Sequence, residues 1–171
     1  GFDLLLDALA AQPAGTAWHW THIGGGALTA RLKAQAERLG LADRIDWRGA
    51  QAQEAVLAAY RAADLFVLPS RIAPDGDRDG LPNVLMEAQS QGLACLSTGI
   101  SGIPELIEDG RTGRLVVPDD AGALADALAA LIRAPAERAR LGAAGQARIR
   151  RDFSHETGIL DLARRFGAPA P

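Results

Sequence analysis

Short apolar segments alternate with longer amphipathic segments along almost the whole chain. Five segments have the length and apolar character of buried strands: 17–23, 44–49, 64–70, 93–98 and 114–118. Segments with helical spacing of apolar residues surround them, at 2–11, 27–41, 52–63, 82–92, 121–133, 135–150 and 155–166. Strands separated by helices usually pair in parallel, because the helix crosses one face of the sheet. The pattern predicts an α/β fold, a Rossmann-like doubly wound parallel sheet with helices on both faces.

Length and composition indicate one soluble domain that spans residues 1–171. A chain of 171 residues can bury about 70% of its unfolded surface, and its 48% apolar and 23% charged residues are ordinary for a globular protein. The net charge of −3 argues against a nucleic-acid partner. The longest apolar stretch, 123–132, is too short to span a bilayer. No signal peptide or initiating methionine precedes Gly1, so we expect a piece of a longer protein.

The single cysteine and the basic C-terminal segment bear on location. Cys95 excludes an internal disulfide and is typical of a reducing compartment, so the sequence predicts a cytoplasmic protein. Its context, LACLST, favours a buried small side chain over a nucleophile. Residues 131–171 carry more basic than acidic side chains. A solvated helix face accounts for this excess, and peripheral contact with anionic lipid heads at the inner face of the membrane is the alternative.

Ligands of doubly wound sheets bind at the carboxyl ends of the strands, so the loops there are the candidate sites. The loop IGGGAL, residues 23–28, joins a predicted strand to a predicted helix. The amides around Gly24 and Gly25 could face an anion, or the glycines could form only a tight turn. In the loop TGISGIPEL, Pro104 and Glu105 are explained by a helix start and its dipole alone.

The third loop, DGDRDGLPNVLMEA at 75–88, is acidic and allows three interpretations. Asp75, Asp77, Asp79 and the following glycine match the start of an EF-hand calcium loop, but the required glutamate arrives one residue late, at Glu87. A strand also precedes the loop where an EF-hand has a helix. Two overlapping DxD motifs fit a metal-dependent sugar transferase, although so short a motif is common by chance.

The third interpretation is a clamp for a phosphorylated ligand. Pro82 suits the first position of a helix, which would leave nearby amides free to face phosphate oxygens; these belong to Leu81, Asn83 and Val84. Glu87 shares a helical face with Asn83 and Ser90, and its carboxylate could accept hydrogen bonds from both hydroxyls of a ribose. The spacing alone favours the other interpretation, in which these residues form the solvent-exposed face of an amphipathic helix.

The stretch DLFVLPSRIAPDGDRDGLPNVLMEAQSQGLACLSTGISGIPELIEDGRTGRLVVPDD resembles the C-terminal, nucleotide-binding half of retaining GT-B glycosyltransferases of family 4, often called glycosyltransferase group 1. The resemblance continues through FDLLLDAL, HIGGGAL and LGLADRIDWRGA and is greatest to bacterial exopolysaccharide transferases of the colanic-acid type. It is most specific at the E-x7-E element of the family.

The resemblance implies a role for each residue of this element. Glu87 matches the glutamate that holds the nucleotide ribose, and Asp79 matches the one that contacts the donor sugar, where the family usually has glutamate. The amides from Gly80 to Val84 would lie by the diphosphate. Enzymes with this fold lack a catalytic metal, so the resemblance implies no metal site and no cofactor, with a UDP- or GDP-sugar as substrate.

Parts of the family's machinery have no counterpart in this chain. The catalytic histidine and the acceptor site of the family belong to an N-terminal domain, and His19, His22 and His155 do not match that histidine. The family's arginine and lysine that neutralise the diphosphate lie just upstream of the position of Gly1. We therefore expect the first strand of the sheet to be truncated and the chain alone to be inactive.

The sequence as a whole predicts the donor-binding domain of a hexosyltransferase. The complete enzyme would move a hexose with retention to a glycan or lipid-linked acceptor in polysaccharide biosynthesis. Two alternatives remain from the sequence: a sugar-nucleotide epimerase of the same fold, and a non-catalytic nucleotide-binding or scaffolding module.

Overall fold

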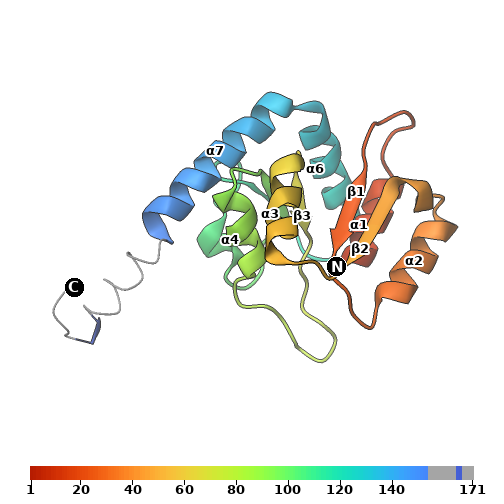
Figure 1. Ribbon diagram of the computed structural model, residues 1–171, viewed down its shortest axis with the longest axis horizontal. Helices are drawn as coiled ribbons and strands as arrows, with labels where there is room; N and C mark the ends of the chain where they lie inside the picture. Colours follow the sequence, from red (N-terminus) through yellow and green to blue (C-terminus); the bar gives the residue numbers. More distant parts are fainter. Residues whose placement is uncertain (154–164, 167–171) are drawn as a thin grey trace.

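The computed structural model describes residues 1–153 and 165–166, so most of the helix predicted at 155–166 lies outside the described residues. The helices are α1 (Phe2–Ala10), α2 (Thr29–Arg38), α3 (Gln53–Ala62), α4 (Asn83–Ser90), α5 (Ile103–Leu106), α6 (Ala121–Arg133) and α7 (Pro135–Asp152), with a short 3-10 helix, η1 (Ala42–Arg44) (Figure 1). The strands are β1 (Trp20–Ile23), β2 (Ile45–Gly49), β3 (Phe66–Leu68), β4 (Cys95–Thr98) and β5 (Arg114–Val116). Each segment predicted within the described residues contains an element of the expected type.

All pairings between these strands are parallel, which confirms the predicted class of fold. The strands form a two-stranded sheet, β1-β2, and a three-stranded sheet in the order β3-β4-β5. Trp20 is opposite Ile45 in the first sheet, and Val67 is opposite Leu96 in the second. The sequence analysis predicted one sheet, and in the described part of the chain no ladder joins β1 to β3.

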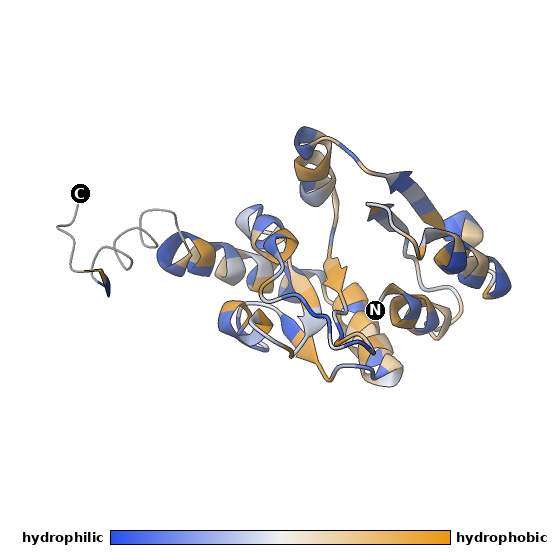
Figure 2. Cartoon of the chain, turned by 90° about the horizontal axis from the view of Figure 1, so that it is seen from below, coloured by the Kyte–Doolittle hydropathy of each residue, from blue (hydrophilic) through white to orange (hydrophobic). Residues whose placement is uncertain are grey.

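Helices cover both faces, and each face has its own hydrophobic core. Leu5 and Leu6 of α1 pack with residues of α2 and α6 in one core, whereas Leu85 of α4 packs with residues of α3 and α5 in the other. The central strand β4 serves both cores, since Leu96 faces the first and Cys95 the second. In Figure 2 the strands in the middle of the cartoon are coloured as hydrophobic, whereas the helices combine hydrophobic and hydrophilic residues. Burial raises the pKa of the Cys95 thiol, and the expected structural role of this residue is confirmed.

Two predicted boundaries change for identifiable reasons. The segment 17–23 pairs only from Trp20, because Arg44 donates hydrogen bonds to the carbonyl oxygens of Thr16 and Trp18, at 2.7 and 3.1 Å, and stacks on the Trp18 ring. Pro82 is the N-cap of α4 and not its first helical residue, since its ψ of 119° is extended. The helix begins at Asn83 as a result.

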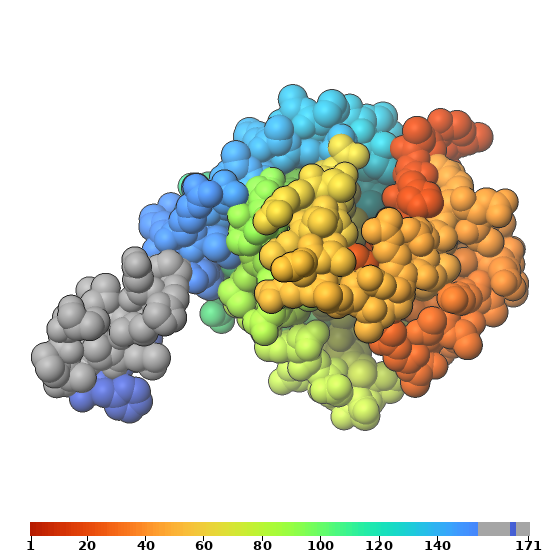
Figure 3. All heavy atoms as spheres, in the orientation of Figure 1, coloured from red at the N-terminus to blue at the C-terminus, as the bar shows by residue number. Residues whose placement is uncertain are grey.

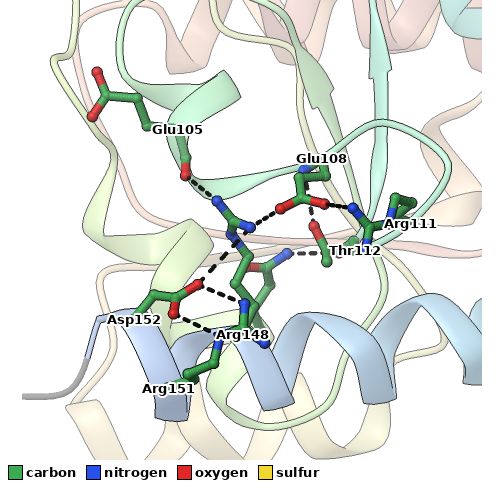
Figure 4. Close-up of polar contacts among 8 residues, drawn as sticks. Glu105, Glu108, Arg111, Thr112, Arg148, Arg151 and Asp152 are labelled. Atoms are coloured by element: carbon green, nitrogen blue, oxygen red, sulfur yellow. Dashed lines mark hydrogen bonds and ion pairs between the residues drawn. The ribbon is translucent and has the colours of Figure 1, made fainter.

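A charge cluster attaches the C-terminal half of α7 to the turn after α5 (Figure 4). Arg148 forms an ion pair with Glu108 and donates a hydrogen bond to the Glu105 carbonyl oxygen at 2.9 Å. Glu108 also pairs with Arg111, and its backbone amide donates to the Thr112 hydroxyl at 2.9 Å. This cluster fixes α7 against the face that carries α4. Within the described residues, no helix combines the length and the apolar character that a membrane span requires.

Candidate functional site

Three loops follow strands at their carboxyl ends, where the sequence analysis predicted a ligand site. The loop after β3 is attached to its neighbours at both ends. Near its start, Thr98 and Ser97 of β4 donate hydrogen bonds to the carbonyl oxygens of Ser70 and Leu68. Near its end, the Gly80 carbonyl oxygen accepts a hydrogen bond from the Gly102 amide at 2.8 Å. The loops after β3 and β4 therefore lie side by side just before α4.

Gly24 to Gly26 follow β1 directly and leave only part of their backbone free for an anion. Gly24 and Gly26 have φ angles of 132° and 156°, values that favour glycine. The Gly24 amide donates to the Gly49 carbonyl oxygen at 2.8 Å, so it is already engaged in the sheet. Gly25 is exposed, and a side chain at this position would have no atom within 4 Å. The tight turn is thus present, while the anion-binding role stays a prediction.

The acidic loop folds on itself. Its carboxylates Asp75, Asp77 and Asp79 are exposed. The Asp75 carboxylate accepts a hydrogen bond from the Asp77 amide at 3.1 Å, which is an Asx turn. Gly76 closes the turn through its amide, which donates to the Ala73 carbonyl oxygen at 2.8 Å. Among the described residues, no three His, Cys, Asp or Glu side chains lie together in a way that could hold an ion.

We expect this loop to bind no metal ion tightly, because the Asp75 carboxylate already caps a turn and the calcium pattern misses by one residue. Calorimetric titration of the chain with calcium, magnesium or manganese should give dissociation constants above about 1 mM, weaker than those of calcium sensor sites. The control is a variant with Asp75→Asn and Asp77→Asn, which keeps the turn geometry. A micromolar site that this variant loses would restore the calcium interpretation.

The start of α4 provides the expected amides. Asn83 and Val84 occupy the first two helical positions, where an amide has no partner within the helix. The Leu85 amide is engaged with the Pro82 carbonyl oxygen at 3.1 Å. The eight residues of α4 direct the positive end of their dipole toward the same point. This end of the helix can therefore favour an anion.

Glu87 lies one turn further along α4 and is half-buried beside Tyr60 of α3. Burial, and then the nearby charge of Glu87, raises the pKa of Tyr60 to about 12. The hydroxyl of Tyr60 therefore remains protonated at neutral pH and available to the carboxylate. The sequence analysis missed Tyr60, because only the tertiary packing of α3 against α4 brings the two side chains together.

Glu87 and Tyr60 line a groove of about 820 Å³ between the two sheets. We call it the inter-sheet groove; it is bounded by Trp20–Ile23 of β1 and by Leu65–Val67 at β3, and Leu5 of α1 contributes to its wall. In Figure 3 a hollow separates the yellow α3 from the orange part of the chain, and red atoms of the N-terminal part are visible inside it. Arg48 of β2 and Gln51, which follows that strand, also contribute to the lining, and the sequence analysis did not predict either residue.

Asp79 and Glu87 differ in their surroundings. Asp79 is exposed and is not among the described residues that line the inter-sheet groove. Gly80 and Leu81 join it to α4, and a side chain at Gly80 would have nothing within 4 Å. Asp79, which the resemblance assigns to the donor sugar, thus lies in an exposed loop. Glu87, which it assigns to the ribose, lies at the wall of the groove.

His22 and Arg71 have structural partners, and His155 lies outside the described residues. His22 packs against the rings of Phe2, Trp20 and Trp47, with centroids 5.1 to 5.6 Å away, and burial lowers its pKa. His19 is exposed. Arg71, just after β3, forms ion pairs with Asp3 and Asp119 across the carboxyl edge of the sheet. The cation nearest this edge in the loop after β3 is therefore already paired.

Comparison with known proteins agrees with this geometry. Residues 1–148 match the family model described as "Glycosyl transferases group 1". The amylovoran biosynthesis glycosyltransferase AmsK of Erwinia amylovora is 38% identical over 87% of this chain and 37% of its own length. The putative colanic acid biosynthesis glycosyltransferase WcaL of Escherichia coli is 36% identical over the same shares. The chain thus spans little more than a third of these relatives.

Solved structures extend the likeness to the whole fold. HepE of Anabaena, solved in complex with UDP-glucose, superposes with a TM-score of 0.84 at 26% identity, over 98% of this chain and 45% of that one. Sucrose-phosphate synthase of Thermosynechococcus elongatus gives a TM-score of 0.83 at 28% identity, over 98% and 41%. Because residues 1–148 of this chain match the family model, the chain belongs to the group 1 glycosyl transferases.

Proposed function

We propose that this chain is the donor-binding domain of a transferase that moves a hexose from a UDP- or GDP-sugar, with retention, to a glycan or lipid-linked acceptor in exopolysaccharide biosynthesis. The observation that carries the proposal is the position of Glu87, one helical turn beyond the free amides of α4, at the wall of a groove that opens between parallel strands. The AmsK relative and the UDP-glucose complex of HepE support the substrate class.

The proposed donor pose follows from the chemistry of these groups. A carboxylate can accept hydrogen bonds from two neighbouring hydroxyls, so Glu87 would hold the ribose. The amides of Asn83 and Val84 would then face the diphosphate, about one turn away toward the start of α4. Asp79, in the exposed loop before α4, would contact the sugar.

The same arrangement would assist the transfer step. As the bond from the anomeric carbon to the diphosphate breaks, the leaving group takes the electron pair and gains negative charge. Amides that are already oriented stabilise this charge without reorganising during the reaction. The dipole of α4 adds an attraction of about 0.3 to 1 kcal/mol. No step of this scheme uses a metal ion or a bound cofactor.

In this proposal, the acceptor site and the catalytic histidine would belong to an N-terminal domain of the complete protein. We place that protein in the cytoplasm, with peripheral contact at the inner face of the membrane, because the lone Cys95 suits a reducing compartment. The basic side chains of α7, among them Arg150, would supply the contact with anionic lipid heads.

Donor screening tests the proposal. The complete polypeptide, supplied with UDP- and GDP-hexoses and with glycan or lipid-linked acceptors, should release the nucleoside diphosphate and form an α-linked product from an α-linked donor. The 171-residue chain is the matched control and should give no product. Conversion of the donor sugar into an isomer would favour the epimerase, and the absence of both turnover and nucleotide binding would reject a donor domain.

A further inference from the structure

Tyr60 of α3 is buried, with 9% of its surface exposed, and its ring is held by apolar neighbours. The ring packs edge-on against Phe66 of β3, with centroids 5.5 Å apart and an angle of 87° between the planes. It belongs to the core that also contains Leu85 and Ala88 of α4. These contacts would suit a phenylalanine equally well. The hydroxyl needs a separate explanation, because a buried tyrosine hydroxyl usually has a hydrogen-bond partner.

The face of α4 that is directed toward α3 supplies this partner. Arg61, next to Tyr60, donates a hydrogen bond to the side-chain oxygen of Gln91 at 2.8 Å. Gln91 follows Glu87 by four positions, and residues four apart share a helical face. Glu87 therefore lies on the same face one turn earlier, at the level of Tyr60. The two side chains both line the inter-sheet groove, which agrees with this arrangement.

The chemistry of Tyr60 makes its hydroxyl a donor to the Glu87 carboxylate. Burial and the charge of Glu87, with a smaller effect of a hydrogen bond between the two side chains, raise the pKa of Tyr60 to about 12. The hydroxyl therefore keeps its proton at neutral pH. A carboxylate has about four acceptor positions on its two oxygens. One hydrogen bond from Tyr60 leaves enough of them for two hydroxyls of a ligand.

The backbone of α4 is held by contacts that do not involve Tyr60. The Ser90 hydroxyl donates to the Glu87 carbonyl oxygen at 2.7 Å, and Gln146 of α7 donates to the Ser90 carbonyl oxygen at 2.8 Å. These contacts fix the helix but not the glutamate side chain, which has several rotatable bonds. Loss of the Tyr60 hydroxyl should therefore change the orientation of the Glu87 carboxylate and leave α4 in place.

A carboxylate that is oriented before the ligand arrives binds it more selectively. Glutamate is among the side chains with the most rotamer freedom to lose when they become ordered. A donor that restricts the carboxylate in the free protein removes part of this cost from the binding step. It also fixes the directions in which the remaining acceptor positions point. Two neighbouring hydroxyls of a ligand can match these directions, whereas a single hydroxyl leaves one position without a donor.

We propose that Tyr60 is a positioning residue that orients the Glu87 carboxylate, so that the site selects ribose over 2′-deoxyribose and 3′-deoxyribose. This inference rests on the proposed function, in which Glu87 holds the ribose. A site that is arranged to bind a hydroxyl discriminates against an analogue without it, because a polar group of the protein is then left unpaired. A carboxylate without the Tyr60 contact can turn toward water instead, and it discriminates less.

Titration of the complete polypeptide with UDP and its two deoxy analogues, and with the same series of GDP, tests the proposal. The wild type should bind the ribonucleotide about 10-fold more tightly than either analogue, and Tyr60→Phe should lower this ratio to about 3-fold. Glu87→Ala should bind all three about equally. In the double variant, Tyr60→Phe should change the ratio no further, because a residue that acts through Glu87 has no carboxylate left to orient.

Ile107→Val is the matched control for packing. It removes one methyl group from the fully buried Ile107 in the core that contains Tyr60, and it should lower the melting temperature slightly without changing the ratio. A ratio that falls as far in Ile107→Val as in Tyr60→Phe would overturn the proposal, because a looser core would then explain both.

The Glu87→Ala arm separates failure of this inference from failure of the proposed function. If Glu87→Ala loses the discrimination while Tyr60→Phe keeps the wild-type ratio, Tyr60 does not position Glu87, and the ribose role of Glu87 stands. If Glu87→Ala itself keeps the wild-type ratio, or the wild type binds neither nucleotide series, the ribose role fails and the positioning role fails with it.

Discussion

Replacing Glu87 with alanine should weaken the binding of UDP and GDP to the complete polypeptide by about 10- to 150-fold, or about 1.5 to 3 kcal/mol. The reason is that the variant lacks the carboxylate at the groove wall, and with it the charge-assisted hydrogen bonds to the ribose hydroxyls. The fold should survive, because Glu87 is only half-buried and its backbone, which accepts hydrogen bonds from Gln91 and Ser90, is unchanged. Isothermal titration with each nucleotide measures the loss.

Two matched variants separate a ribose contact from a general effect of charge. Glu37→Ala removes an exposed glutamate from α2, and it should leave the affinity unchanged. Tyr60→Phe removes the hydroxyl beside Glu87 and keeps the ring that packs on Phe66, with centroids 5.5 Å apart; it should cost less than the loss of Glu87 itself. Equal dissociation constants for the wild type and Glu87→Ala would reject the ribose role. Glu87 would then be only part of the solvent-exposed face of α4.

The local elements could be predicted because their signals are local. The run that ends at Leu68 is short and apolar, and Pro82 stands immediately before a segment with helical spacing, so strand and helix followed from a few neighbouring residues. The same local signals led to the error at Pro82, since proline suits both the N-cap and the first helical position. Only the ψ angle of 119° decides between them.

The tertiary arrangement could not be read in this way, because it depends on contacts between distant segments. Nothing near Tyr60 in the sequence indicates that it lies beside Glu87, 27 positions later. The ion pairs of Arg71 with Asp3 and Asp119 join the loops after β3 and β5 to the first turn of α1. The separation of β1 from β3 is also a property of the whole sheet. Periodicity reports which face of an element is apolar, but it does not report its neighbours.

A second large effect is expected at Gly142, where α7 makes its closest approach to the rest of the protein. A Cβ atom here would lie 2.0 Å from the Gly92 carbonyl oxygen and 3.2 Å from the Ala94 amide nitrogen. Both neighbours are backbone atoms, which cannot rotate away as a side chain would. Carbon contacts are favourable at about 3.5 Å, so Gly142→Ala should force α7 outward by about 1 to 1.5 Å.

The displacement should be costly because several buried contacts depend on the position of α7. Leu141 is fully buried beside Gly142, and Gln146 donates a hydrogen bond to the Ser90 carbonyl oxygen of α4 at 2.8 Å. Overpacking of this kind costs about 1 to 3 kcal/mol. Alanine normally stabilises a helix by about 1 kcal/mol relative to glycine, so the sign of the result is informative. We expect a net loss of stability.

Thermal unfolding measures this loss, and Gly122→Ala is the matched control. Gly122 is an exposed glycine in α6, and a Cβ atom there would meet only the Asp120 carboxylate, at 3.3 Å. The control should leave the melting temperature unchanged or raise it slightly, whereas Gly142→Ala should lower it by about 3 to 10 °C for a domain of this size. Since α7 packs on the helix that carries Glu87, nucleotide affinity should fall as well. If Gly142→Ala melts at the wild-type temperature or above it, the close packing of α7 on the Gly92 turn is wrong, and Arg148 with its carboxylate partners must position that helix without this contact.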